Sequence, residues 1–559
     1  MINILRTFSI GIICANLFSF LGAQHTVGLI SYDFDKTYDG YNLFYPHNQP
    51  HVFLLNNCGE IVNVWQDEPL IRPGNSVYLL EDGDLVKCSR HNMVTDDVIW
   101  AGGGGEFIEI RDWNNDLKWR FTLNDSLQRI HHDIAIMPNG NILAITWDRK
   151  LKDEAVEAGR DTAMLTKGEI WPEAILEIRP DGDTFQIVWE WHVWDHLIQD
   201  YDATKANYGV VADNPGLINL NWGSNEGTAS WMHANAIDYH PVLDQILLSI
   251  PTFNEIWIID HSTTTEEAVG HGGGLSGRGG DLMFRWGNPA VYGRGEVDDQ
   301  TLFFQHDAHW VDAHLDASHP HFGKIAVYNN RVGMDSSSAN ILNPLFLDYA
   351  WMYAMGTDET FLPEGFDWSY SHPDKTKMFS GGLSSVQLLS NGNTLICSAT
   401  IGYLFEVTGT GEIVWEYIVP LRMGNPVAQG VQLLSNENLT WRAHRYPADF
   451  AGFTGRDLSA KGFIELSPDT AFCDLTSAVS NIWTSFDISV FPNPVSELLT
   501  VNWEDNAIQS IQLFDHLGRM MLTTHGEGGR IVLDLEHLET GLYWLRVGQH
   551  RLCKVIVSR

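Results

Sequence analysis

Short apolar runs joined by polar turns recur along most of the chain, and they form two alternating kinds of hairpin. In the first kind, turn pairs such as Asp82-Gly83 or Asn139-Gly140 separate two apolar runs, because these residues tolerate positive φ. In the second kind, the second run ends in tryptophan. The first kind is predicted at residues 75–89, 131–147, 233–250, 306–330, 384–398 and 430–441. The second kind is predicted at 51–65, 106–119, 175–189, 255–286 and 403–415, with a degraded copy at 345–353 and a half copy at 463–466.

This alternation amounts to about six units of four strands each. Radial packing of such sheets protects their edges and gives a β-propeller. We therefore predict an all-β fold with a six-bladed β-propeller over residues 24–466. The early hairpin at 51–65 is expected to complete the sheet that holds the last propeller strands, and the tryptophans are expected to lie in the core between sheets.

The two ends of the chain differ from this repeat. Residues 1–23 have a basic start at Arg6, an apolar core and a small-residue cleavage site, which predicts a signal peptide. No other segment is long and apolar enough for a transmembrane helix, so no integral membrane segment is expected after cleavage. Residues 467–485 are predicted to be a linker, and residues 486–559 a small C-terminal β-sandwich.

Composition excludes one class of partner and indicates no cofactor. The 71 acidic and 34 basic residues give a net charge of −37, so nonspecific nucleic-acid binding is excluded. Of six cysteines, Cys14 lies in the signal peptide, and the scattered others allow one disulfide whose pairing stays open. No metal site is predicted. The acidic residues would permit a structural Ca²⁺, but no EF-hand or repeated Asp motif indicates one.

Histidines stand at matching points of the repeat. The pair His131-His132, then His233 and His306, each begin a strand-like segment. A single histidine there is usually satisfied by backbone groups, but three segments at matching points favour a shared site. Neutral imidazole acts as a nucleophile or base, and protonated imidazole binds anions.

These segments resemble the arylsulfotransferase family over residues 27 to 466. The resemblance is carried by residues 26–44, 131–144 (HHDIAIMPNGNILA), 231–249 (WMHANAIDYHPVLDQILLS), 305–310 (QHDAHW), 391–396 and 405–417. It implies a secreted six-bladed propeller that moves a sulfuryl group from one phenolic ester to another without a nucleotide donor. The implied substrates are small aryl sulfate esters and phenols.

Residue roles follow from the resemblance. It implies that His306 is the nucleophile, that His233 and Asn235 bind the sulfuryl oxygens, and that the His131-His132 pair supplies a further imidazole, with His132 favoured. Sulfuryl transfer, like phosphoryl transfer, passes through a loose transition state, so positioning and oxyanion donors dominate its catalysis.

The chain departs from the family at Pro251, where the family has a sulfate-binding arginine. Neither proline nor the following threonine replaces a guanidinium. Arg331 or Arg445 is the candidate replacement, and Arg331 is assigned to substrate binding. Three functions remain open: the transferase, a secreted hydrolase or lyase on the same scaffold, and a ligand-binding propeller without catalysis.

The C-terminal tail resembles the sorting domain of the type nine secretion system. The matching pieces are FPNP at 491–494, FDHLGR at 514–519, GLYWLRV at 541–547 and the basic end at 554–559. This resemblance implies recognition by the secretion machinery and export through the periplasm and outer membrane. The expected location is therefore secreted or at the cell surface.

Overall fold

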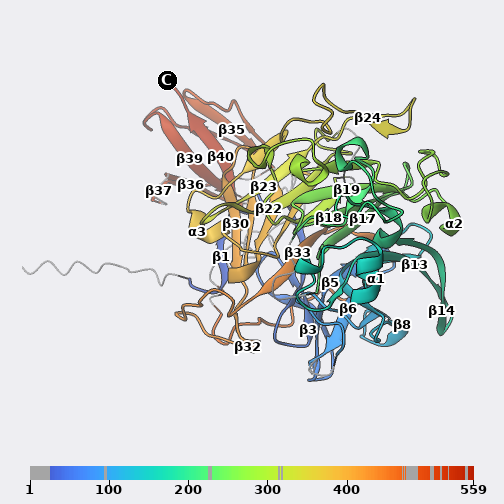
Figure 1. The fold of residues 1–559 in the computed structure, drawn as a ribbon. Coiled ribbons are helices and arrows are strands. Elements are labelled where there is room, and N and C mark those ends of the chain that lie inside the picture. Colours follow the sequence, from blue (N-terminus) through green and yellow to red (C-terminus); the bar gives the residue numbers. More distant parts are fainter. Residues whose placement is uncertain are drawn as a thin grey trace, which may run out of the picture. The chain divides into compact units, whose positions relative to one another are not determined.

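The computed structural model describes residues 25–559 except 93–96, 224–228, 312–314, 316–318, 469, 471–472, 474–488, 504–508, 516–518, 527 and 548–551. The predicted signal peptide and most of the predicted linker lie outside the described residues. The chain divides into two compact units, Met1–Pro468 and Asp469–Arg559 (Figure 1). Among the described residues, no helix has the length and apolarity needed to span a membrane.

The first unit contains six antiparallel sheets of four or five strands each. The first sheet joins both ends of the unit, and the next two follow in chain order: β33(Thr440–Pro447)-β2(Gly40–Pro46)-β3(His51–Asn56)-β4(Ile61–Gln66), β5(Ile71–Leu79)-β6(Leu85–His91)-β7(Phe107–Arg111)-β8(Leu117–Thr122), and β9(Gln128–Ile136)-β10(Ile142–Asp148)-β13(Glu173–Asp181)-β14(Thr184–His192). The remaining three are β17(Ala236–His240)-β18(Gln245–Ile250)-β19(Glu255–Asp260)-β20(Phe284–Trp286), β21(His306–Trp310)-β22(Ile325–Gly333)-β23(Ser336–Leu342)-β26(Trp368–Tyr370), and β27(Ser385–Leu388)-β28(Thr394–Ser398)-β29(Tyr403–Val407)-β30(Ile413–Ile418)-β1(Gly28–Tyr32).

Short elements decorate these sheets. Four two-stranded sheets are β11(Lys150–Leu151) with β12(Glu169–Ile170), β15(Leu197–Ile198) with β16(Ile218–Asn219), β24(Phe346–Leu347) with β25(Met352–Tyr353), and β31(Leu421–Arg422) with β32(Asn425–Pro426). The helices of the described residues are α1(Lys152–Glu157), α2(Thr265–Ala268), α3(Lys375–Met378), η1(Thr162–Met164), η2(Val193–His196), η3(Val211–Asp213), η4(Pro289–Tyr292), η5(Val297–Asp299), η6(Ala399–Ile401) and η7(Ala451–Phe453).

The all-β prediction is confirmed, and so are most of the predicted hairpins. Gly140 and Gly392 have φ of 84° and 86° in the turns of β9–β10 and β27–β28, which is why the Asn-Gly pairs mark these turns. The hairpin at 51–65 forms β3–β4, and β2 beside it pairs with the late strand β33. The expected closure between early and late strands is thus present.

Three predicted copies of the repeat are wrong. Residues 430–439 contain no strand, and the late strand begins at Thr440 and pairs with β2 instead of a hairpin partner. Residues 345–353 form the separate pair β24–β25, so the fourth strand of the fifth sheet is β26. Phe463 makes only an isolated bridge to Glu60. Local apolar pattern does not specify which distant strand is available as a partner.

The innermost strands close a ring. In the order β33, β5, β9, β17, β21 and β27, each contacts the next, and β27 contacts β33. Polar side chains link these strands at every step. The links are Tyr446 Oη accepting from Leu79 N, Tyr78 Oη donating to Asp133, Asp133 accepting from Ile237 N, Asp238 from Trp310 N, Asp307 from Val386 N, and Gln387 bonding both backbone groups of Arg445.

The tryptophans of the outer hairpins make a second set of links. All five predicted ones are buried, as expected. The indole N–H groups donate to the following sheet: Trp65 to Asp112 O, Trp119 to Thr184 O, Trp189 to Thr263 Oγ1, Trp286 to Pro363 O and Trp415 to Asn57 O. The repeated tryptophan therefore has a physical reason, because it fills the space between sheets and satisfies a polar atom of the neighbour.

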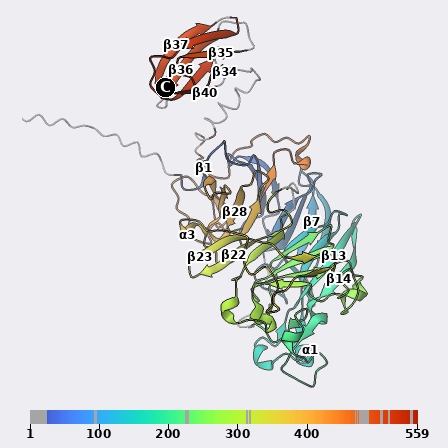
Figure 2. The ribbon, with the colours of Figure 1, turned by 90° about the horizontal axis from the view of Figure 1, so that it is seen from above.

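The second unit has two antiparallel sheets around one core (Figure 2). They are β34(Ser489–Phe491)-β35(Leu498–Asn502)-β38(Arg530–Asp534) and β37(Met520–Gly526)-β36(Gln509–Asp515)-β39(Gly541–Val547)-β40(Leu552–Val557). Alternate residues such as Leu499 and Val501, or Ile511 and Leu513, are buried in this core, as half-buried strands require.

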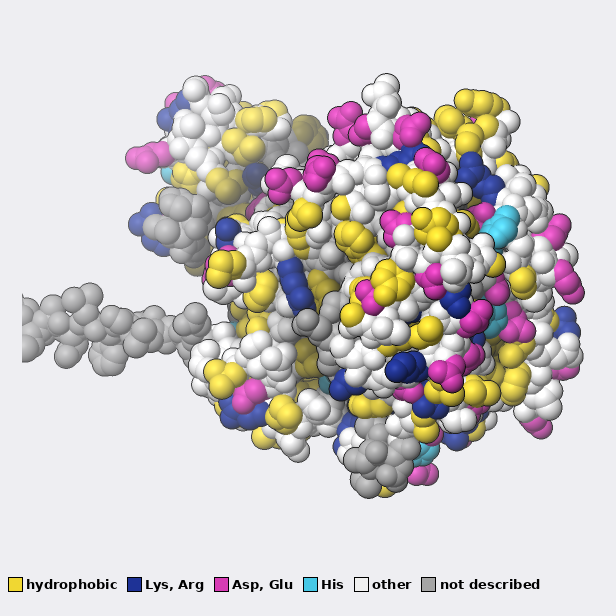
Figure 3. All heavy atoms as spheres, viewed as in Figure 1, with side chains coloured by type: hydrophobic (Ala, Val, Ile, Leu, Met, Phe, Trp, Pro, Cys, Tyr) yellow, Lys and Arg dark blue, Asp and Glu magenta, His cyan; other side chains and the backbone are white. Residues whose placement is uncertain are grey.

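The cysteines and the surface add two observations. Cys58 and Cys473 are disulfide-bonded, whereas Cys88 and Cys397 are free thiols. On the face shown in Figure 3, Lys and Arg side chains are interspersed with Asp and Glu side chains.

The link between the last and first sheets can be tested by Trp415→Phe. The substitution keeps an aromatic ring but leaves the buried Asn57 carbonyl without its donor. We expect the free energy of unfolding to fall by about 1–3 kcal/mol, measured by urea denaturation. Trp368→Phe is the control, since the Trp368 indole makes no hydrogen bond within the described part of the chain. Equal losses in both variants would contradict this role of the indole.

Candidate functional site

The structure brings the three predicted catalytic histidines together. His132 lies on β9, His233 just before β17, and His306 begins β21. The ring centroids of His132 and His233 are 4.5 Å apart, and the Trp441 ring lies 5.6 Å from His132 and 5.6 Å from His306. His132 and His306 are buried, and His233 is half-buried. We call them, with His131, the histidine group.

Backbone strain concentrates at this group. His132, His233 and Asp307 have φ of 53°, 60° and 60°, a left-handed conformation that is uncommon for residues other than glycine. The pairing register also shifts between His306 and His309, as in a β-bulge. Such bulges re-aim side chains, and strained backbone is concentrated at functional sites.

His306 is held in one tautomer by its neighbours. Its Nδ1 lies 2.8 Å from Asn330 Oδ1 and 3.1 Å from Phe304 O. Asn330 Nδ2 donates to two carbonyls, of Ser380 and Leu383, so the amide oxygen must face the ring. Nδ1 therefore carries the hydrogen, and Nε2 keeps its lone pair. Burial lowers the pKa of His306 to about 3, so the ring is neutral at physiological pH.

His233 and Asn235 are also fixed. Ser230 Oγ lies 3.0 Å from His233 Nδ1, and burial lowers the pKa of His233 to about 4. Asn235 is fully buried, and its Nδ2 donates to Gln305 O at 2.8 Å. One N–H of Asn235 thus positions the residue that precedes His306, and its second N–H makes no hydrogen bond within the described part of the chain.

His131 connects His132 to a buried carboxyl group. The two Nδ1 atoms of His131 and His132 are 2.8 Å apart, and the His131 ring stacks on Trp147 with centroids 4.0 Å apart. On the other side of the ring, His131 Nε2 lies 3.9 Å from Glu173 Oε1. Burial raises the pKa of Glu173 to about 8 although the carboxyl accepts from Ala234 N. Sequence reasoning missed Glu173, which has no motif around it.

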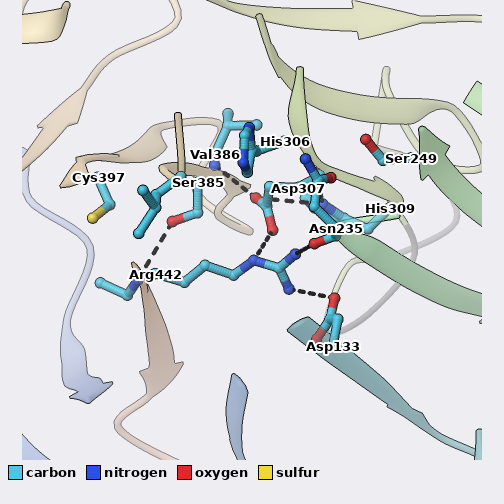
Figure 4. Close-up of polar contacts among 12 residues, drawn as sticks. Asp133, Asn235, Ser249, His306, Asp307, His309, Ser385, Val386, Cys397 and Arg442 are labelled. Carbon is cyan, nitrogen blue, oxygen red and sulfur yellow. Dashed lines mark hydrogen bonds and ion pairs between the residues drawn. The ribbon is translucent and has the colours of Figure 1, made fainter. Parts of the chain in front are cut away.

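Arg442, which sequence reasoning also missed, ties these segments together (Figure 4). Its Nη1 donates to Asp133 Oδ2 at 2.6 Å, its Nε lies 2.9 Å from Asp307 Oδ1, and its Nη2 donates to Asn235 O at 3.1 Å. Burial lowers the pKa of Arg442, but the two carboxylates outweigh burial and raise it above its usual value. One guanidinium thus holds the residue after His132, the residue after His306 and the second residue after His233.

The two candidate replacement arginines have different surroundings. Arg445 is fully buried and pairs with Glu406 and Asn42, so it belongs to the contacts between sheets. Arg331 is exposed, donates from Nε to Gly381 O, and places its guanidinium 3.8 Å from the centre of the Phe304 ring. The Phe304 ring is in turn 5.7 Å from that of His306. Of the two, Arg331 is therefore the one beside the histidine group.

The position of Pro251 has a local explanation. β18 ends at Ile250, and Pro251 begins a tight turn in which Asn254 N donates to its carbonyl. Thr252 Oγ1 donates to the carbonyls of Trp231 and Met232. This turn therefore supports the segment that leads into His233 instead of supplying a guanidinium.

A cavity of about 850 Å³ follows the innermost strands. It is lined by Asp133, Asp307, Arg442, His309 and Trp310 among others, but by none of the histidine group. The three histidine segments line this cavity only through residues that follow their histidines. Since Arg442 and its carboxylates contact both regions, they form the boundary between the cavity and the histidine group. Within the cavity lining, the Nδ1 of His309 lies 2.9 Å from the backbone oxygen of Asp307.

Comparison with protein families identifies the family of the first unit and the class of the C-terminal tail. The model of the arylsulfotransferase (ASST) family matches residues 35–419, more than half of the chain, so the chain belongs to this family. Residues 489–558 match the secretion system C-terminal sorting domain. Both resemblances found in the sequence are thereby confirmed. The family indicates a sulfotransferase-like protein, and the sorting domain implies export by the secretion machinery to the surface or the medium.

Comparison with individual proteins adds little. None of the curated proteins is a significant match. A protein of unknown function from Bacteroides caccae is 11% identical, with 73% of this chain and 98% of that chain covered and a TM-score of 0.37. AztD from Citrobacter koseri is 8% identical, with 73% of this chain and 98% of that chain covered and a TM-score of 0.31. Virginiamycin B lyase from Staphylococcus aureus is 10% identical, with 72% of this chain and 86% of that chain covered and a TM-score of 0.29. These scores are too low to support an argument about function.

Arg442→Met tests the role of the guanidinium. The variant leaves Asp133 and Asp307 as buried carboxylates without their cation, so we expect the free energy of unfolding to fall by about 3–5 kcal/mol. Adding Asp133→Asn and Asp307→Asn to Arg442→Met should recover part of that loss, since the unpaired charges cause it. Urea denaturation of the single and triple variants measures both effects. A triple variant less stable than the single one would contradict the explanation.

Proposed function

We propose that this chain is a secreted sulfotransferase that transfers a sulfuryl group from an aryl sulfate ester to a phenol through a sulfohistidine at His306. The observation that carries this proposal is the hydrogen bonding of His306 Nδ1 to Asn330, which leaves Nε2 as a neutral nucleophile. Membership in the arylsulfotransferase family supports the substrate class. The proposal needs no nucleotide donor and no metal at the histidine group.

The fold supports this proposal. We take the six sheets of the ring as the blades of a six-bladed β-propeller, and the two sheets of the second unit as a small β-sandwich. In a propeller the innermost strands surround a central channel, and the histidine segments belong to or directly precede the innermost strands β9, β17 and β21. The sandwich would be the part that the secretion machinery recognises.

In the first half-reaction, His306 Nε2 attacks sulfur as the bond from sulfur to the aryl oxygen breaks. An N–S bond forms, and the aryl oxygen leaves as phenolate, which suits a loose transition state with charge on the oxygens. His233, the second N–H of Asn235 and the Arg331 guanidinium are the proposed donors to those oxygens. Donors held in a buried site stabilise such charge without reorganisation.

In the second half-reaction, the oxygen of an acceptor phenol attacks sulfur, the S–N bond breaks, and His306 returns to its neutral form. The phenol proton passes to His132 Nε2. Because His132 is buried and its pKa lies well below the usual range, a lasting imidazolium there is unfavourable. His131 and Glu173 offer a path for the charge: a proton leaves His132 Nδ1 for His131 Nδ1, and another leaves His131 Nε2 for Glu173.

The choice between functions follows from one assay of the full chain. Purified protein is incubated with a chromogenic aryl sulfate, with and without a phenol. Acceptor-dependent release of the chromophore supports the transferase. Release at the same rate with and without the phenol identifies a sulfatase. No release favours a ligand-binding role, which is supported by Pro251 in place of the family's arginine.

His306→Ala tests the nucleophile. With donor alone, the wild-type chain should release a burst of phenol and gain the mass of a sulfuryl group on the peptide that contains His306. The variant should show neither, because it lacks the nitrogen proposed to bind the sulfuryl group. Rapid-quench kinetics and mass spectrometry provide the measurements.

The control for His306→Ala is His309→Ala, which removes a histidine from the same strand but outside the histidine group. It should retain the burst and the adduct. An adduct on His132 or His233 would reassign the nucleophile, and full activity of the His306 variant would end this mechanism.

Glu173→Gln tests the proton path by its pH dependence. The amide can still accept from Ala234 N but cannot take a proton. Since the pKa of Glu173 is about 8, the carboxylate that receives the proton forms as the pH rises through 8. Transfer to weakly acidic phenols should therefore increase over that range in the wild type. The variant should lack this increase and be slower by about 10²-fold, the usual loss on removing a general base.

Acceptors of different acidity separate this effect from structural damage. Phenols that are already ionised need no base, so both proteins should transfer to them equally, and the donor burst should also be equal. A uniform loss for all acceptors, or an unchanged pH profile, would show that Glu173 does not receive the proton.

A further inference from the structure

A second cluster of histidines lies outside the histidine group. It consists of His196 at the end of η2, and His271 and Asp281 in the connection between β19 and β20. One ligand atom from each of these residues lies within 4.8 Å of the other two. The pattern was not predicted, because the sequence around these residues contains no metal motif.

The tautomer of His196 directs a lone pair into this cluster. His196 is fully buried, and its Nε2 lies 2.8 Å from Ala268 O, a group that can only accept. Nε2 therefore carries the hydrogen, and in the neutral ring Nδ1 has the lone pair. That Nδ1 faces Asp281 Oδ1 at 2.9 Å. With Nε2 committed to the carbonyl, Nδ1 is the atom that faces Asp281, and a proton or a metal ion between the two atoms satisfies both of them.

A second imidazole converges on the same oxygen. His271 Nδ1 lies 2.8 Å from Asp281 Oδ1, and the rings of His196 and His271 are 5.9 Å apart. Histidine bound to a metal usually donates its other N–H to a backbone carbonyl or carboxylate, as His196 does to Ala268. Two imidazole nitrogens and one carboxylate oxygen are a donor set that suits zinc and related ions.

The surrounding chain holds this arrangement in place. The His196 ring stacks on Trp191, with an interplanar angle of 9°, and the Trp191 indole donates to Gly280 O. A Cβ on Gly280 would lie 2.5 Å from His196 Nε2 and 2.1 Å from Ala268 O, so only glycine lets the chain pass this close. The carboxylate of Asp281 follows directly after that glycine.

Another histidine of the same unit shows the contrast. His261 has a carboxylate at each ring nitrogen, with Asp244 Oδ1 2.6 Å from Nδ1 and Glu177 Oε2 3.2 Å from Nε2. Those two carboxylates overcome burial and raise its pKa to about 9, so a proton on each nitrogen satisfies that site. At His196 one nitrogen is committed to a carbonyl, and two imidazoles share one carboxylate oxygen.

We propose that His196, His271 and Asp281 form a binding site for a divalent first-row transition metal, with Zn²⁺ as the ion to test. Tetrahedral ligands of Zn²⁺ at about 2.0–2.2 Å lie roughly 3.3–3.5 Å apart, so the cluster opens by about half an ångström on binding. The exposed side chain of His271 permits this movement. His271 also lines a cavity of about 430 Å³, where water or a small ligand supplies the fourth ligand.

A bound ion would cross-link the segment after the third sheet to the long connection within the fourth sheet. η2 follows the last strand of the third sheet, and the segment from His261 to Met283 connects β19 to β20 of the fourth sheet. Bound metal therefore cross-links this long connection to the neighbouring sheet and raises the stability of the folded chain by mass action. None of the three ligands belongs to the histidine group, so the proposal does not depend on sulfuryl transfer.

Zinc titration of the full chain tests the proposal. Protein purified without a histidine tag is stripped with a chelator, dialysed and titrated with ZnCl₂ in a calorimeter, and its metal content is measured after gel filtration. We expect one Zn²⁺ per chain at this site and a melting temperature that rises with Zn²⁺. Co²⁺ in place of Zn²⁺ should give the visible absorption of a tetrahedral nitrogen and oxygen site.

His271→Ala is the decisive variant, because an exposed side chain can be removed without disturbing the core. It should weaken Zn²⁺ binding by about 100-fold or more, since loss of even an outer partner of a ligand costs 10–100-fold. Asp281→Asn should have a similar effect. His91→Ala is the matched control: His91 is exposed and contacts Glu106 at 2.9 Å, without a second imidazole. Failure of the wild type to bind Zn²⁺, or equal binding by the His271 and His91 variants, would overturn the proposal.

Discussion

The buried guanidinium of Arg442 is the contact on which the geometry of the histidine group depends. It comes from the strand that closes the ring and reaches the third, fourth and fifth sheets through Asp133, Asn235 and Asp307. A buried ion pair gains little net stability, because desolvation of the charges offsets their attraction. Its consequence here is positional: each of its partners is one or two residues from a histidine of the group.

Closure of the ring and assembly of the site are therefore the same event. The polar links between innermost strands run through Asp133 and Asp307, which also bind Arg442. The strained backbone of His132, His233 and Asp307 persists only if surrounding contacts over-determine it. The outer tryptophans provide such contacts at the far side of the sheets. A rigid scaffold of this kind suits a reaction whose barrier is lowered mainly by positioning.

Burial gives the histidine group its chemistry. It keeps His306 and His233 neutral, which favours a nucleophile over an anion-binding cation. It also makes a carboxyl group such as Glu173 hold its proton near neutral pH. The cost of this arrangement is that the buried group itself holds no free permanent cation, since Arg442 is neutralised by two carboxylates. In the proposed reaction, positive charge for a sulfate comes from the edge of the group, where Arg331 lies over Phe304.

The sequence by itself determined the local features. Asn-Gly turns, the alternation of apolar runs and the recurrent tryptophans are set by near neighbours, and they predicted the hairpins and the all-β fold. The histidines could be found because each occupies the same point of a repeated unit. Only the tertiary structure decided which strand closes the first sheet, because the local pattern of residues 430–441 predicts a hairpin, whereas the actual partner of β33, β2, is far away in the chain. It also separated Arg331 from Arg445, and brought Arg442, Glu173 and the His196 cluster to their partners. Those contacts join residues from distant segments, and no local spacing encodes them, because the ring must close before the groups meet.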